Sequence, residues 1–256
     1  LLLGALLAPA PPGRETIQTA MRDAVLHGEN RIRLLGMEVN PALVSALVVT
    51  GVVLLTAVLL RIFVITRFRM EPGGLQLLLE TAVSLFDGLA RSSSPHRNRF
   101  LGAYVFSAGV YIFLGTLFEL FGFQAVAVSG LSVALPAPLS DVNAAISLGC
   151  LSYLVILSGG IAGNGLKGVG RTLKDFSLPL SMSFRLFGAL LSGLLVTELV
   201  YHYISLSFVL PVVIAVLFTL LHALIQAYVL TMLTALFYGE VSEPAPSGET
   251  RVHYAR

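Results

Sequence analysis

The sequence predicts an all-α integral membrane protein with about five transmembrane helices and one amphipathic helix on the membrane surface. Of its 256 residues, 56% are hydrophobic and 12% are charged, whereas a soluble domain has about twice that share of charge. The mean hydropathy is +0.87. Several apolar runs reach the roughly 20 residues that a helix needs to cross a bilayer core of about 30 Å.

The chain starts with a segment that we expect to lie outside the bilayer core. Residues 1–12 stay unassigned, because LLLGALLAPAPP is too short to span. Residues 13–40 are polar and of mixed charge, and we interpret them as a tail or surface helix. The first spanning run is 41–66, where Pro41 after Asn40 suits a helix start. We therefore divide the chain into an N-terminal tail (1–40), a membrane domain (41–239) and a C-terminal tail (240–256).

The segment after the first span predicts the surface helix. Apolar residues recur there at helical spacing while charged residues interrupt any span. The apolar set is Leu75, Leu78, Leu79, Ala82, Phe86 and Leu89, and the charged set is Glu80, Asp87 and Arg91.

Four further runs predict the remaining spans. They cover residues 100–122, 143–165, 177–204 and 207–239. The last two are long and follow each other closely, so we expect them to pack as a hairpin.

Basic residues predict the orientation. Segment 61–99 holds six arginines, 123–142 holds no lysine or arginine, and 164–175 holds Lys167, Arg171 and Lys174. Because cytoplasmic loops are enriched in lysine and arginine, these segments alternate as cytoplasmic, outside and cytoplasmic. The N-terminus is then outside and the C-terminus cytoplasmic, although the four arginines of the tail argue weakly against it.

The most informative residue is Arg185, in LPLSMSFRLFGALLSG. A charged side chain at bilayer depth costs about 2.5–3.5 kcal/mol on insertion scales, which indicates a functional role. The residues that share its helical face are small: Gly188, Ala189, Ser192 and Gly193, and Ser181 and Met182 extend this face towards the start of the helix. Small faces also serve ordinary helix packing, but packing does not require a fixed charge.

Other polar residues lie in the predicted spans. Glu198 and His202 share a second face of the Arg185 helix, and Thr219, His222 and Gln226 form one line on the last helix. Glu119, Asn143 and Ser147 lie near the outer ends of their helices, and Asp141 suits a helix cap. Solvated helix ends or hydrogen bonds between helices remain alternatives for several of them. Together they favour a hydrated pathway.

Other classes of function lack support. Cys150 is the single cysteine and no Cys/His cluster has metal-ligand spacing, so we expect no metal, disulfide or cofactor. A net charge of +2 without a basic run gives no support for nucleic-acid binding. The phosphate-loop pattern GxxxxGK[ST] is absent from the sequence.

The sequence resembles the a subunit of the membrane sector of F-type ATP synthases, most of all bacterial forms. LSMSFRLFGALLSG resembles the family's arginine motif, LIQAYVLTMLTALFYGEVSE its last helix, and PLSDVNAAISLG its PTADVN segment. The resemblance extends over roughly residues 30–243. Ala189 departs from the Asn that often follows RLFG, and Leu194 from an acidic residue found in many members.

The resemblance implies a non-catalytic stator that forms an ion path with a ring of c subunits, its last two helices tilted along the ring. Arg185 matches the essential arginine, Gln226 the glutamine facing it, Glu198 an acidic residue of the access channel, and Asp141 with Asn143 the channel mouth. The face of Ser181, Gly188, Ala189, Ser192 and Gly193 would meet the ring. Expected partners are the ring, the b-subunit peripheral stalk, the other subunits and the lipid bilayer of a bacterial plasma membrane, or alternatively an organellar inner membrane.

Two other interpretations remain. A secondary transporter would use Arg185 to bind an anionic substrate, but it predicts internal repeats, and the two halves of the sequence show none. A purely structural subunit would not explain several polar faces at bilayer depth. The transported ion, H⁺ or Na⁺, is left open, because its ligands would lie mainly on the ring.

Overall fold

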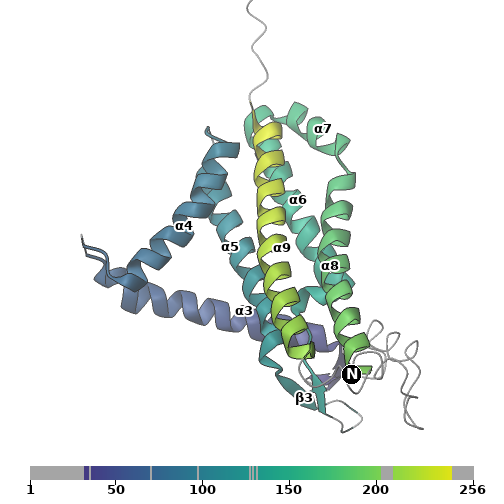
Figure 1. The fold of residues 1–256 in the computed structure, drawn as a ribbon. Coiled ribbons are helices and arrows are strands. Elements are labelled where there is room, and N and C mark those ends of the chain that lie inside the picture. The colour runs from purple at the N-terminus through teal and green to yellow at the C-terminus, as the bar shows by residue number, and fades with distance from the viewer. Residues whose placement is uncertain are drawn as a thin grey trace, which may run out of the picture.

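The computed structural model describes residues 32–34, 36–69, 71–96, 98–126, 128, 130, 132–202 and 210–243. These residues form a mainly helical structure with two short hairpins (Figure 1). The long helices are α3 (Pro41–Leu59), α4 (Gly74–Ser93), α5 (Asn98–Leu117), α6 (Val142–Asn164), α8 (Ser177–His202) and α9 (Leu210–Ser242). The prediction of an all-α membrane protein is confirmed.

Shorter elements connect these helices. A π-helix, η1 (Leu60–Val64), and a 3₁₀ turn, η2 (Ile65–Arg67), extend α3, and the 3₁₀ turn η3 (Phe118–Phe121) extends α5. The 3₁₀ turn η4 (Pro138–Ser140) precedes α6, and α7 (Leu166–Lys174) joins α6 to α8. The antiparallel pairs are β1 (Ile32–Leu34) with β2 (Met37–Val39), and β3 (Gln124–Val126) with β4 (Ser132–Ala134).

Four helical stretches of the described chain are long and apolar enough to cross a membrane. They are Pro41–Arg67, Phe100–Phe121, Val142–Asn164 and Val216–Ser242. Each corresponds to a predicted span. Helix α8 forms as expected but is not among the four, so a fifth span remains a prediction.

The helices start where the sequence provides caps. The Asn40 side chain accepts a hydrogen bond from the Ala42 N–H at 3.0 Å, and Pro41 occupies the first turn of α3. At α6 the Asp141 carboxylate accepts from the N–H groups of Asn143 and Ala144. Helix α6 ends at Gly165, whose φ of +58° is a conformation that side chains with a Cβ disfavour. The predicted cap role of Asp141 is therefore confirmed.

Helices α5, α6, α8 and α9 surround the main core. Its buried members include Leu101, Ile112, Ile156, Leu186 and Leu230. Apolar side chains gain little by leaving lipid for protein, so close packing and interhelical hydrogen bonds must hold such helices together. Tyr104 and Ser152 supply one such bond, with their hydroxyl oxygens 2.8 Å apart between α5 and α6.

Glycines of α6 and α9 allow close contacts between helices. A Cβ at Gly159 would overlap the Tyr238 ring, and one at Gly163 would lie 2.8 Å from the Ser242 Cα. Gly239 of α9 in turn lies against the Ser93 carbonyl. Backbones therefore approach each other directly, as in small-residue interfaces of membrane helices.

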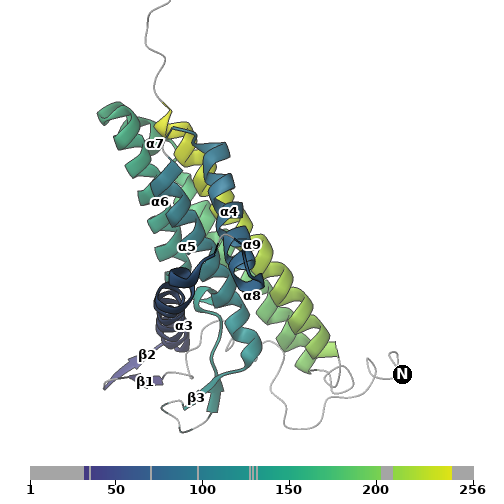
Figure 2. The same cartoon turned by 90° about the vertical axis from the view of Figure 1, so that its left-hand side faces the viewer.

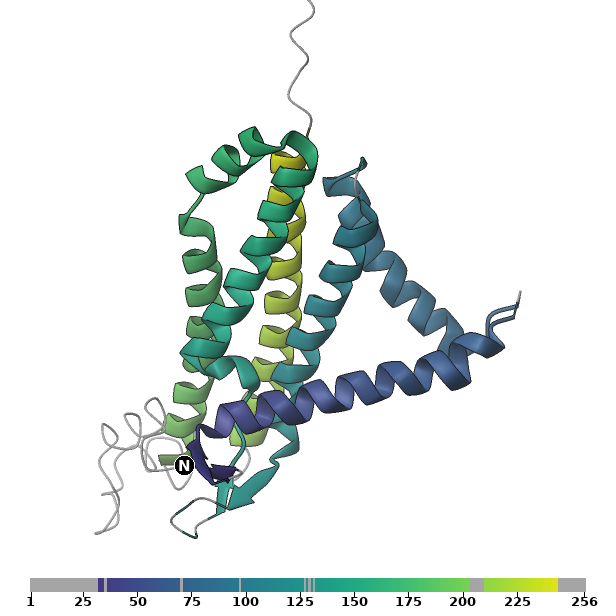
Figure 3. The same ribbon diagram turned by 180° about the vertical axis from the view of Figure 1, so that it is seen from behind.

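Helix α3 departs from this bundle. Figures 1 and 3 show it crossing the base of the other helices steeply, while α4 returns diagonally to the opposite end. The buried residues of α3 lie in its first half: Pro41, Ala42, Ser45 and Val49. In the span Pro41–Arg67, 11% of the most apolar window is buried, so most of this stretch is open at the surface of the described chain.

Most connections lie at the two ends of the bundle of α5, α6, α8 and α9. Both hairpins lie at one end, which we call the hairpin end, as Figure 2 shows; Ile32, Val49, Phe118 and Leu135 pack together there. At the opposite end, the α7 end, the Asn164 amide donates to the Val241 carbonyl at 2.9 Å. The orientation that the alternation of basic residues predicts stays a prediction, because the turn between α3 and α4 lies at the side of the bundle and not at the α7 end (Figure 1).

Three elements of the fold were not predicted from the sequence. The hairpins are short, with three residues in each strand, and α7 has nine residues including two glycines. Segments this short give little periodic signal. Of the segment 13–40, which was predicted to be a tail or surface helix, Ile32–Leu34 and Met37–Val39 form the first hairpin instead. The part of this segment before residue 32 and the tail after residue 243 lie outside the described residues.

Candidate functional site

The site is centred on Arg185 in the first half of α8. Neighbouring positions Met182, Ser183 and Leu186 are 1–3% exposed, whereas Arg185 and Phe184 are exposed. The helical period of 3.6 residues separates these two sets onto different faces. One face of α8 therefore packs into the core, and the other presents a guanidinium at the surface of the chain.

Close packing of α6 fixes which face of α8 is buried. Gly149 of α6 lies against Ser183 and Pro179, where an added Cβ would be 2.8 Å from the Pro179 carbonyl oxygen. The Ser183 hydroxyl donates to that same carbonyl at 2.6 Å. Because this contact leaves no room for rotation of α8, Arg185 is held away from α6.

Within the described part of the chain, Arg185 has no ion-pair or hydrogen-bond partner. A fixed charge on an apolar helix costs about 2.5–3.5 kcal/mol in the middle of a bilayer. Such residues normally pair with another polar group or face water. A group from outside this chain can reach the guanidinium without displacing any described residue.

The small residues beside Arg185 leave an open surface. A Cβ added to Gly188 or Gly193 would meet nothing within 4 Å. Ser181, Gly188 and Ser192 are exposed, and Ala189 and Gly193 are half-buried. Packing within the chain therefore does not account for this face, in contrast to Gly149.

The prediction for one residue beside Arg185 is wrong. Met182 was expected to extend the face of Arg185, but it is 2% exposed and belongs to the core. It precedes Arg185 by three residues, a rotation of about 60° from the same face. That angle is enough to turn its side chain towards the core.

The predicted polar line on α9 lies between its buried and exposed faces. Thr219 and His222 are half-buried and Gln226 is 7% exposed. The Nδ1 atom of His222 lies 2.8 Å from the Phe218 carbonyl oxygen of its own helix, and its ring stacks on that of Phe218. No hydrogen bond joins Gln226 to Arg185 among the described residues.

At the hairpin end, Asp141 connects two helix starts. Its second carboxylate oxygen accepts a hydrogen bond from the Asn40 side chain at 2.5 Å. Asp141 thus caps α6 while holding the residue that caps α3. This role of Asn40 was not predicted from the sequence, although a cap residue stands directly before each of the two helices.

The other predicted residues of this end differ in burial. Asn143 and Ser147 are exposed on α6, and the Ser147 hydroxyl donates to the Asn143 carbonyl at 2.7 Å. Glu119 is half-buried in η3, which contacts α9. Glu198 and His202 lie on α8, but their side chains fall outside the part of the structure that is described.

Some of the elements that carry the predicted site residues contact each other. Helices α8 and α9 contact each other, and η3 and η4 contact α9 and α8 respectively. Glu119 and Asp141 are thereby brought to the helices that carry Arg185 and the line of Thr219, His222 and Gln226. Among described residues, no group of three or more His, Cys, Asp or Glu side chains could hold a metal ion.

A protein-family model matches most of the chain. The family described as ATP synthase A chain matches residues 46–239. The chain belongs to the ATP synthase A chain family. It is therefore a multi-pass membrane component of the Fo sector of ATP synthase, and it takes part in ATP synthesis and ion transport with other subunits of that complex.

Proposed function

We propose that this member of the ATP synthase A chain family is the non-catalytic ion-translocating stator of a rotary motor. In this proposal it forms two half-channels against a ring of c subunits, and Arg185 separates them. The observation that carries the proposal is an exposed guanidinium on an apolar helix with no described partner in its own chain. In this proposal its counter-ion comes from another subunit.

The surface around Arg185 supports a ring as that partner. Gly188 opens onto free space, so a neighbouring helix can approach the α8 backbone closely. Large apolar side chains flank it on the same helix: Leu180 and Phe184 are 56% and 61% exposed. A partner that moves past this surface would contact apolar side chains on either side of one fixed charge.

The chemistry of a rotor carboxylate explains why one arginine suffices. A carboxylate can pass through lipid only when neutral, because burying an unpaired charge is prohibitive. Opposite Arg185 the same group should ionise, since a nearby cation favours the charged form. Each carboxyl therefore releases its ion on arriving at Arg185 and takes up another after passing it.

Arg185 also separates the half-channels. Its positive charge repels cations and blocks direct flow between them. Lysine would keep the charge, but it would lose the planar donor fork and would deprotonate more readily. One charge crossing 100 mV supplies about 2.3 kcal/mol, so a rotor that accumulates several steps suits ATP synthesis.

The half-channels would use the polar residues described above. We assign Glu198, His202, Glu119, Asn143 and Ser147 to the path at the hairpin end, with Asp141 at its mouth. Thr219, His222 and Gln226 would continue this path along α9 towards Arg185. Thr219 and His222 are half-buried, so water between this chain and a neighbouring subunit could contact both side chains, which supports this assignment.

The distribution of basic residues supports an orientation. Lys167, Arg171 and Lys174 belong to the α7 end, which would face the cytoplasm of a bacterial cell, and the hairpin end would lie outside. The N-terminus is then outside and the C-terminus cytoplasmic. The b-subunit peripheral stalk would be a further partner.

Replacing Arg185 by alanine tests the proposal. We expect Arg185→Ala to abolish proton-driven ATP synthesis in membrane vesicles while the complex still assembles. Arg91→Ala is the matched control, because Arg91 is an exposed arginine paired with Asp87 at 2.7 Å on α4. Synthesis at the control's level in the Arg185 variant would refute the role.

A second variant tests the relay. Glu198→Gln should slow ion flux without loss of assembly, because an amide cannot take up and release a proton. Normal flux in this variant would mean that the path avoids Glu198. Synthesis under a sodium gradient, with and without a protonophore, identifies the ion.

A further inference from the structure

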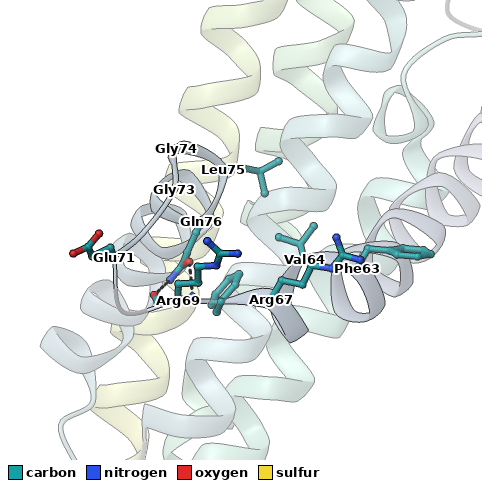
Figure 4. Close-up of a pocket in the computed structure, with 10 residues that line it drawn as sticks. Phe63, Val64, Arg67, Arg69, Glu71, Gly73, Gly74, Leu75 and Gln76 are labelled. Carbon is teal, nitrogen blue, oxygen red and sulfur yellow. Dashed lines mark hydrogen bonds between the residues drawn. The ribbon is translucent and has the colours of Figure 1, made fainter.

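A pocket of about 480 Å³ lies between the first span and the surface helix, away from the Arg185 site (Figure 4). Residues of η1, η2, the following turn and the start of α4 line it. Its lining includes two arginines, Arg67 and Arg69, and apolar side chains that include Phe63, Phe68 and Leu75. No role in the ion path follows from its position.

The two arginines are available to a ligand. Among the described carboxylates, none forms an ion pair with Arg67 or Arg69. Glu71 also lines the pocket, but in Figure 4 its carboxylate points away from both guanidinium groups. Two guanidinium groups without a local counter-ion attract an anion, and their planar donor forks match phosphate oxygens.

The start of α4 adds to this positive field. Its cap residue is Gly73, which provides no capping side chain, and the first turn carries no acidic residue. The N–H groups of that turn and the helix dipole are therefore uncompensated at the pocket. The helix has 20 residues, so its dipole is fully developed.

The loop that carries Arg69 is held in place. The Gln76 side chain accepts a hydrogen bond from the Arg69 N–H at 3.1 Å and donates to the Arg69 carbonyl at 3.0 Å. Gln76 also donates to Glu80 at 2.7 Å on the next turn of α4. The π-helical turn at Leu60–Val64 and the following 3₁₀ turn end the span abruptly, so the chain turns into the pocket at once.

The surroundings indicate the source of the anion. Arg67 is the last residue of the membrane-crossing stretch Pro41–Arg67. Phe63 and Leu75 are each 57% exposed beside the pocket, so the lining offers an apolar surface directly next to the charges. A free phosphate would use only the charges, whereas a phospholipid would use both.

We propose that this pocket binds the phosphate of an anionic phospholipid headgroup, with its acyl chains against Phe63 and Leu75. Arg67, Arg69 and the first turn of α4 hold the phosphate. This bound lipid anchors the turn between the first span and the surface helix at the bilayer surface. The inference does not depend on the role of Arg185.

Photolabelling of the whole ATP synthase complex tests this site. The complex is reconstituted in phosphatidylcholine vesicles that contain phosphatidylglycerol and a trace of photoactivatable phosphatidylglycerol, and label on peptide 63–76 is measured by mass spectrometry. We expect Arg67→Gln or Arg69→Gln to weaken labelling roughly fivefold each, and both together roughly thirtyfold. Arg91→Gln, the matched control, should label like the unmodified complex.

Two further arms separate the sources of the anion and the role of the loop. Excess inorganic phosphate should not displace the label, and photoactivatable phosphatidylcholine should label the peptide weakly. Gln76→Ala should reduce labelling although every arginine remains. The proposal is overturned by full labelling of the double arginine variant or of Gln76→Ala, by displacement with phosphate, or by cross-links of this loop to a protein subunit instead of lipid.

Discussion

Replacing Gly149 by alanine tests the contact that orients Arg185. A Cβ at this position would lie 2.8 Å from the Pro179 carbonyl oxygen, about 0.6 Å inside the 3.4 Å at which ordinary contact begins. The Ser183 hydroxyl can rotate away, but the Pro179 carbonyl belongs to the α8 backbone. The alanine variant must therefore push α8 away from α6.

The matched variant is Gly188→Ala on the open face of α8. Its new Cβ would meet nothing within 4 Å. Alanine improves helix propensity by about 1 kcal/mol in both helix interiors, so that contribution cancels in the comparison. Overpacking of this kind typically costs 1–3 kcal/mol, and we expect Gly149→Ala to be less stable than Gly188→Ala by roughly that amount.

Unfolding of the purified chain in mixed micelles measures the difference. Helicity is followed by circular dichroism while the mole fraction of dodecyl sulfate rises, and the midpoints of the two variants are compared. Equal midpoints would show that α6 and α8 do not touch at Gly149, and the reasoning that fixes the exposed face of Arg185 would fail.

Three further variants examine other contacts. Asp141→Ala should cost about 1 kcal/mol in the same assay by uncapping α6, and it also removes the acceptor for Asn40; an unchanged midpoint would contradict the cap role. Gly239→Ala should displace the Ser93 carbonyl and speed proteolysis of the adjacent turn, whereas unchanged cleavage would rule out that contact. Gly188→Phe should change the free energy of unfolding by no more than about 0.5 kcal/mol yet lower ATP-driven ion pumping roughly tenfold. Normal pumping would exclude this face as the ring contact.

The sequence predicted the helices well because their signal is local. Spans expected at 41–66, 100–122 and 143–165 appear as helical stretches at 41–67, 98–121 and 142–164. Twenty apolar residues in succession leave few alternatives to a helix in a bilayer. The helix at Gly74–Ser93 followed from apolar spacing, although its place on the membrane surface stays a prediction, and Asp141 as a cap followed from its place before α6.

The candidate site was predictable only in part. The sequence identified Arg185 because a charge in an apolar helix is costly wherever the helix packs. It could not separate Met182, which is buried, from Ser181, which is exposed, since both lie within about one turn of Arg185. Which of the two faces inwards depends on where α6 approaches.

Hydropathy and local periodicity, which are properties of neighbouring residues, were enough to predict the membrane class, the long helices and the charge that needs a partner. Tertiary structure decided the rest. The contact of Gly149 with α8 set which side of that helix is open, the bond from Asn40 to Asp141 tied two helix starts together, and the return of α4 placed Arg67 and Arg69 in one pocket. Each of these depends on groups distant in sequence, whose approach is fixed by packing of whole helices.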